Sequence, residues 1–414
     1  QTSVDGFQGL GPMSIALGVG GGSLAGGVAI VHDSVDALAI ADSRVDVNAS
    51  GDVAVTATSD HVLDVDVVGA AVGGFAVGFT VAEGEITGAT RAQVQPIGGA
   101  GNGARLRGRN VRVSAEANTR DTVSASGAGG AGGAAAVGAL ATATVTPTII
   151  ASIGDGSAVL ASGDVQVQAA SRSGGTTATA TGISAAGVAA VGATRAKVAL
   201  NPETRAGVGR DVDMQAQGSI TVRAEAPDGV ATAMASPFAG GGAVALAVTS
   251  ADAEASATTV AQVGSGSTLQ AAQSLTIEAQ AGNLASAEGR SASFGLGAGV
   301  GVVQTNAKAN GVTQAVVDAS PAARGALQGS SVAVTARSAD RAVAKSSATS
   351  GGVLSGSGSE AEATATPQIQ AEIGANVDVT TTGALAVRAS YLPEADSQAK
   401  GYGGGVATAG ASIA

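Results

Sequence analysis

The sequence predicts an all-β fold: an elongated parallel β-solenoid, or β-helix, built from repeats of about 55 residues and continuous over residues 1–414. Three observations support this prediction. A short alternating phrase recurs at a nearly constant interval. A second phrase, containing Pro and Gly, recurs at a fixed distance before it. The apolar residues are mostly Ala and Val, which suit thin, closely stacked layers.

The alternating phrase occurs seven times, at residues 52–57, 110–115, 164–169, 219–224, 274–279, 331–336 and 384–389. Its first apolar residues are Val53, Val111, Val165, Ile220, Leu275, Val332 and Leu385, at intervals of 58, 54, 55, 55, 57 and 53 residues. The residue two positions further on is always β-branched, as at Val222 and Ile277. Apolar and polar residues that alternate in this way indicate a half-buried strand. We therefore expect seven equivalent strands with aliphatic side chains inside.

The Pro–Gly phrase reads PTIIASIG at 147–154, PETRAGVG at 202–209 and PQIQAEIG at 367–374. Only the Pro, an Ala, an aliphatic residue and the final Gly recur at the same offsets, and the first apolar residue of the next alternating phrase lies 11 residues after that Gly. Pro fixes φ and cannot donate a hydrogen bond to a sheet, so it suits a corner or the first residue of a strand. Gly permits a tight turn. The phrase therefore predicts a corner, a short strand and a turn.

A repeat of about 55 residues is long for a single coil, so its length predicts two or three coils per repeat. At about 4.8 Å per coil, 15–22 coils would form a rod of roughly 70–105 Å. The longer intervals before Val111 and Val332 contain extra residues, which predict surface loops on one side of the array. The first and last residues align with the middle of a repeat, so we expect both ends to be truncated mid-repeat and the chain to be a segment of a longer array.

Composition excludes several classes of function. The chain has no Cys, which excludes disulfides, zinc–thiolate sites and a cysteine nucleophile. Its formal charge of −11 argues against nucleic acid as a partner. Residues 122–154 are uncharged, but they consist mainly of Ala, Gly, Thr and Ser, so we expect no membrane span.

The repeats follow the pattern A-x-[IV]-G … [DS]-[VL]-x-[VI]-x-A, separated by passages such as GGAAAVGALATATV. This pattern resembles the repeat regions of very large secreted bacterial surface proteins, the filamentous-haemagglutinin-like and autotransporter-type adhesins. The resemblance implies a β-solenoid stalk or filament segment, extracellular or at the cell surface, that serves adhesion, cell cohesion or fibre formation. It implies as partners the neighbouring repeats or other copies stacked end to end, and cell-surface or matrix polysaccharide. It supplies no catalytic motif.

The residues themselves predict no catalytic, cofactor-binding or metal site. His32 and His61 lie 29 residues apart, without the spacing of a zinc site or a catalytic triad, and we expect both to be solvated or at an edge. The pairs Asp64/Asp66 and Asp211/Asp213 would each face one side of a strand, where weak calcium binding between coils stays open. A solvated acidic face is the simpler interpretation of both pairs.

The predicted function is therefore that of a non-enzymatic structural protein. The alternative is a carbohydrate-active β-helix, a polysaccharide lyase or hydrolase. Such an enzyme needs clustered acids beside Lys or Arg, and aromatic platforms for sugar rings. Here the charges are scattered along the sequence and aromatic residues make up 2% of it, which favours the structural interpretation.

Overall fold

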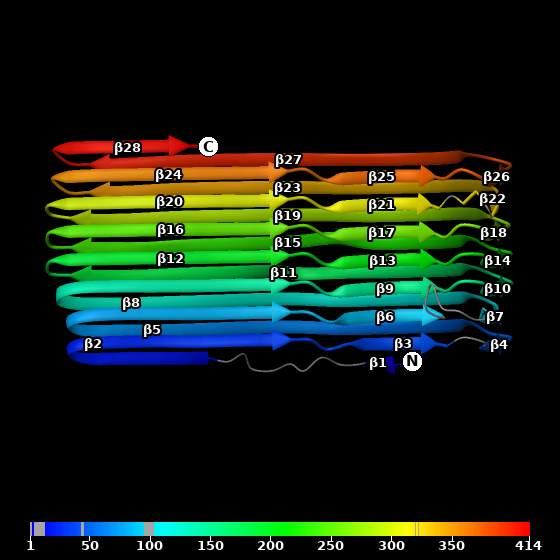
Figure 1. The fold of residues 1–414 in the computed structure, drawn as a ribbon, viewed down its shortest axis with the longest axis horizontal. Coiled ribbons are helices and arrows are strands. Elements are labelled where there is room, and N and C mark those ends of the chain that lie inside the picture. Colours follow the sequence, from blue (N-terminus) through cyan, green and yellow to red (C-terminus); the bar gives the residue numbers. More distant parts are fainter. Residues whose placement is uncertain (1, 4–12, 43–44, 95–102, 319, 322) are drawn as a thin grey trace.

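The computed structural model describes residues 2–3, 13–42, 45–94, 103–318, 320–321 and 323–414. Within these residues the regular elements are all β-strands, and every strand pairing is parallel, as expected. The strands form one 14-stranded sheet and two seven-stranded sheets. Figure 1 shows the strands running horizontally, with successive coils of the chain stacked on one another.

One coil is represented by β11 (Val165–Ala186), β12 (Ala189–Leu200), β13 (Glu203–Val208) and β14 (Asp213–Ala216). The chain runs out along β11, turns, and returns along β12. It then passes a corner at Pro202 into β13, and a second corner leads to the short β14. The next coil repeats this path from β15 (Ile220–Gly241), which pairs with β11 from Val165↔Ile220 onward.

The other coils follow the same plan. The outgoing strands are β19 (Ser274–Gly295), β23 (Ser331–Gly351) and β27 (Leu385–Gly404), and the return strands are β16 (Val244–Ala255), β20 (Ala298–Ala309), β24 (Leu354–Ala365) and β28 (Ala407–Ile413). In the first coils one element covers both directions, as in β2 (Met13–Asp33), β5 (Val53–Ile86) and β8 (Val111–Val145). The short β1 (Thr2–Ser3) pairs with β5.

The two smaller sheets contain one short strand from each coil. The first consists of β3 (Ala37–Ala41), β6 (Ala89–Val94), β9 (Thr148–Ile153), β13, β17 (Thr258–Val263), β21 (Val312–Val317) and β25 (Gln368–Ile373). The second consists of β4 (Asp46–Asn48), β7 (Arg105–Gly108), β10 (Ala158–Ala161), β14, β18 (Thr268–Ala271), β22 (Gly325–Gly329) and β26 (Val377–Thr381).

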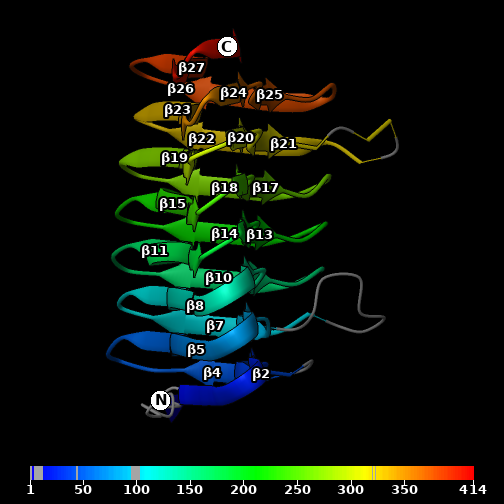
Figure 2. The same cartoon turned by 90° about the vertical axis from the view of Figure 1, so that its left-hand side faces the viewer.

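The predicted elongated β-solenoid is wrong. In the large sheet an 11-strand path runs from β27 through β8 to β28, so its two halves face each other as a flattened, nearly closed barrel flanked by the two smaller sheets. Each repeat makes one wide coil, not two or three, because an outgoing strand such as β11 alone takes 22 residues. The longest axis therefore runs along the strands and not along the stack (Figures 1 and 2).

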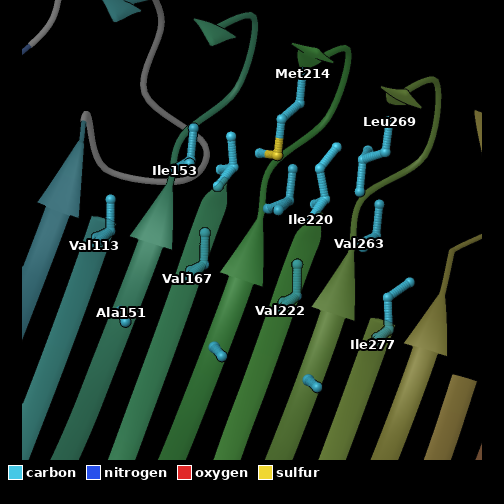
Figure 3. Close-up of a cluster of buried hydrophobic side chains, with 14 of the residues drawn as sticks. Val113, Ala151, Ile153, Val167, Met214, Ile220, Val222, Val263, Leu269 and Ile277 are labelled. Carbon is cyan, nitrogen blue, oxygen red and sulfur yellow. The ribbon is translucent and has the colours of Figure 1, made fainter. Parts of the chain in front are cut away.

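The seven alternating phrases lie at the start of the outgoing strands and pair in register. Val167, for example, is paired with Val113 on one side and with Val222 on the other. Figure 3 shows these side chains pointing into the same core as Ile153 and Met214 from the two smaller sheets. All five are at most 2% exposed. The phrases therefore supply one wall of a core closed by the short strands.

The interior is thinner toward the turn between outgoing and return strands. A Cβ atom added to Gly127 would lie 2.7 Å from Cγ1 of Val137, and one added to Gly289 would lie 2.5 Å from Cγ1 of Val303. Such distances are well inside van der Waals contact, so the two layers leave room mainly for Gly, Ala, Ser and Thr. The composition reflects this close approach.

The final Gly of the Pro–Gly phrase is needed for a reason other than the one expected. A Cβ atom at Gly209 would lie 2.6 Å from the backbone nitrogen of Asp155 in the preceding coil, so close stacking requires glycine there. The equivalent Gly264, in a repeat with Ala257 at the Pro position, is equally close to the carbonyl oxygen of Gly209. The left-handed turn comes two residues later, where φ is 67° at Gly156, 52° at Asp211 and 75° at Gly266. Two adjacent constraints therefore fix each corner.

Shortening one of the buried side chains that pair in register between coils should destabilise the coils on both sides of it. Ile277→Ala removes a fully buried side chain and is expected to lower the free energy of unfolding by about 2–4 kcal/mol. Hydrogen exchange of the β15, β19 and β23 amides measures this locally, since contacts join each coil to its neighbours only. The neighbouring outward change Thr276→Ala should cost at most about 1 kcal/mol. Equal losses for the two variants would contradict the assignment of inner and outer faces.

Candidate functional site

A polar groove of about 290 Å³ lies on the outer face of the return strands β12, β16, β20 and β24. It is lined by Arg195, Ser250, Asp252, Gln304, Thr305, Asn306, Glu360 and Glu362. These residues come from four repeats and are up to 167 positions apart in the sequence. Only the stacking of coils brings them together.

Strand alternation and register place the groove residues in two adjacent columns. Arg195, Ser250, Gln304 and Glu360 are successive partners in the first column. Lys197, Asp252, Asn306 and Glu362 are successive partners in the second column. Successive partners are about 4.8 Å apart, so each column presents a polar group at every strand.

Hydrogen bonds tie the groove residues to one another. Oδ2 of Asp252 lies 3.4 Å from Nη2 of Arg195 and accepts a bond of 3.2 Å from Oγ of Ser250. Nε2 of Gln304 donates to Oε2 of Glu360 at 3.5 Å. Oδ1 of Asn306 is buried and has no hydrogen-bond partner among the described residues. The exposed side chains of Gln304, Glu360 and Glu362 offer amide and carboxylate groups at the groove surface, an arrangement suited to ligands that carry hydroxyl groups.

The two histidines have different environments. His32 is exposed, as expected, and its Nδ1 lies 2.6 Å from Oε2 of Glu85. His61 is buried, which corrects the expectation that it is solvated, and its Nδ1 lies 2.9 Å from Oδ2 of Asp33. The nearby hydroxyl of Ser59 is bonded to Oγ1 of Thr90 at 2.6 Å, so it is not directed at the imidazole.

The two acidic pairs singled out in the sequence lie in different settings. Asp64 and Asp66 both point outward from β5. Asp211 occupies a left-handed corner before β14, while Asp213 is the first residue of that strand. No group of three or more His, Asp or Glu side chains among the described residues is placed to hold a metal ion. Calcium binding at either pair stays a prediction.

Two buried acids escaped the sequence analysis. Asp340 accepts hydrogen bonds from Nδ2 of Asn283 and Oγ of Ser338, and Oδ1 of Asn283 in turn accepts a bond of 3.1 Å from the backbone N–H of Ala257. Asp121 is fully buried, and neither of its carboxylate oxygens has a partner among the described residues. Asp340 therefore has hydrogen-bond partners, whereas Asp121 has none among the described residues.

The environment of Asp121 raises the pKa of its carboxyl group. It lies on β8 between its in-register neighbours Leu63 and Thr176. Burial raises the pKa of Asp121 to about 7, and the negative charge of Asp64 adds to the effect. The burial of Asp121 could have been predicted from the sequence. It lies ten residues after Val111, and in a strand every second residue faces the same side.

Comparison with known proteins identifies no relative: no family model, curated protein or solved structure matches the chain. The resemblance to large bacterial adhesins therefore stays a prediction. The part of the chain that the structure describes contains no helix with the length and apolar character needed to cross a membrane.

Asp121 should make folding stability depend on pH. The carboxyl group titrates near 4 in the unfolded chain and near 7 in the folded one, so its contribution to stability is greatest below about pH 4, falls as the pH rises, and is lowest above about pH 7. Asp121→Asn removes the charge and is expected to raise the free energy of unfolding at pH 8 by about 2–4 kcal/mol relative to its effect at pH 4. Urea unfolding at the two pH values measures the difference.

The matched control is Asp66→Asn, which changes an exposed carboxylate on β5 and should give nearly the same difference at both pH values. A gain from Asp121→Asn that is equal at pH 4 and pH 8 would show that Asp121 does not titrate with folding.

Proposed function

We propose that the chain is a non-enzymatic structural protein, extracellular or at the cell surface, that serves adhesion, cell cohesion or fibre formation. The observation that supports this proposal is the continuity of strand pairing. Outgoing strands from β5 to β27 pair in parallel register with their neighbours, β19 with β23 over 21 residue pairs. Such a stack transmits load through backbone hydrogen bonds along its whole height.

The regular interior leaves the outer face free to vary. Within one column the outward residues change from Lys197 to Asp252, Asn306 and Glu362, while the neighbouring inward positions are limited to Ala, Val and Thr. A surface that varies on a constant scaffold suits contact with other molecules. We propose the polar groove as the place where the chain contacts polysaccharide, since its carboxylates and amides can bind sugar hydroxyls.

One observation favours the enzymatic alternative. The groove lining collects three acids, Asp252, Glu360 and Glu362, and Asp252 is paired with Arg195, although these charges are scattered in the sequence. Acids beside an arginine are the groups that a polysaccharide lyase or hydrolase requires. The two functions differ in whether bound polysaccharide is cleaved.

Display of the chain on a non-aggregating bacterial host tests the structural function. Cells that carry it are expected to settle or attach several times faster than cells displaying an unrelated β-rich domain, because each copy adds a rigid, extended surface. No difference between the two cell populations would contradict the proposal.

The same purified chain distinguishes binding from cleavage. With neutral and acidic polysaccharides we expect retention on immobilised polymer, weakened by the groove variant Glu362→Gln, with no release of new reducing ends. New reducing or unsaturated ends that disappear in Asp252→Asn would instead assign the chain to the carbohydrate-active enzymes.

A further inference from the structure

Large apolar side chains cover the outer face of the return layer next to the turn. This apolar face consists of Phe75, Val77, Phe79, Val191, Val244, Val248, Val300 and Val302. Their exposed fractions range from 38% to 66%. They lie in adjacent columns, since Val77, Val191 and Val300 share one column and Phe79, Val248 and Val302 share the next.

The same strands carry their small residues inward. Next to the turn, the inward positions of β20 are Gly299 and Gly301, while Val300 and Val302 point outward. The paired inward positions of β16 are Ala245 and Ala247. The thin interior explains why small residues face inward, but it does not explain why large apolar residues face water. A soluble surface carries such a concentration of apolar groups mainly where a partner covers it.

The apolar face is flat and uncharged. No charged residue occurs at 75–82, 189–194, 244–251 or 298–307, and the charged groups begin at Arg195 and Asp252 in the bordering polar groove. Three columns on the five strands from β5 to β20 cover roughly 480 Å². A standard interface buries about 800 Å² per partner, so this patch would supply an apolar centre and the groove margin a polar rim.

The opposite layer argues against insertion of this end of the molecule into a lipid bilayer. Arg290 lies six residues before the turn at Leu296, about as far from the turn as Val302 is on the return strand. Arg290 forms an ion pair with Glu288, and 72% of its side chain is exposed. A bilayer that covered Val302 would also have to take up this ion pair, which is unfavourable in hydrocarbon. The occupant must therefore cover one layer only.

A second copy of this chain meets these requirements. Two flat sheet faces with regularly spaced aliphatic side chains can interdigitate at about 10 Å. An antiparallel arrangement centred on the apolar face places the groove margins of the two chains at opposite ends of the contact, which separates their charges although each chain has a formal charge of −11. The patch can serve both copies equally, as a two-fold interface requires.

We propose that the apolar face is a self-association surface through which two copies of the chain pack sheet against sheet, related by a two-fold axis. This contact is lateral and so differs from end-to-end stacking of coils. It is independent of the proposed adhesive or cohesive function, because a monomeric chain could still serve that function.

Sedimentation equilibrium of the full chain tests the proposal. The wild-type chain is expected to form dimers with a dissociation constant between about 1 and 100 µM. The double variant Val248→Lys/Val302→Lys places two charges in the centre of the apolar face and should remain monomeric. The matched control is Ser250→Lys/Gln304→Lys, which adds the same charges two residues further along the same strands and should weaken dimerisation by less than about tenfold. Far-UV circular dichroism identical to wild type establishes that each variant is folded.

Three results would overturn the proposal. The first is a wild-type chain that is monomeric throughout this concentration range. The second is association that persists in Val248→Lys/Val302→Lys, which would place the contact at another surface or at the edge strands. The third is a monomeric chain that binds phosphatidylcholine vesicles and loses this binding in the same variant, which would assign the face to lipid.

Discussion

The parallel register between coils is the constraint on which the other features of this molecule depend. Backbone hydrogen bonds hold each residue beside its counterpart in the next repeat, as at Val113, Val167 and Val222. Residues at equivalent positions of successive repeats therefore form columns that extend through the stack of coils. The buried ladders, the polar groove and the apolar face are all columns of this kind, and each acquires its character from several repeats at once.

Much of the fold was accessible from the sequence because alternation and period are local, repeated signals. The number of coils per repeat was not, because Gly187 and Gly209 look alike in composition and both allow close stacking on the preceding coil, at Gly132 and Asp155. Gly187 belongs to a turn that joins two facing layers, whereas Gly209 lies at a corner that leads to a short strand. Composition reports that glycine is needed, but not which neighbour requires it.

The candidate site likewise has a part that the sequence predicts and a part that it does not. The inward position of Asp121 follows from the alternation of inward and outward residues along one strand, so it can be predicted from the sequence. The groove does not follow from local pattern, since Arg195, Asp252 and Glu362 meet only when the pairing of β12, β16, β20 and β24 is known. Each return strand is thus polar where it lines the groove and apolar near the turn, and this contrast is visible only in three dimensions.

The in-register stack has a consequence for how such a chain can change over generations. Loss of one residue near the start of β16 would reverse the inward and outward faces of the rest of that strand, turning Thr249 outward and Val248 inward. The columns that pass through this part of β16 would then be interrupted. Duplication or deletion of a whole repeat of about 55 residues leaves the remaining columns intact, because each coil touches only its neighbours. Length in this architecture can therefore evolve in whole-coil steps, while the interior of each strand is closed to small insertions.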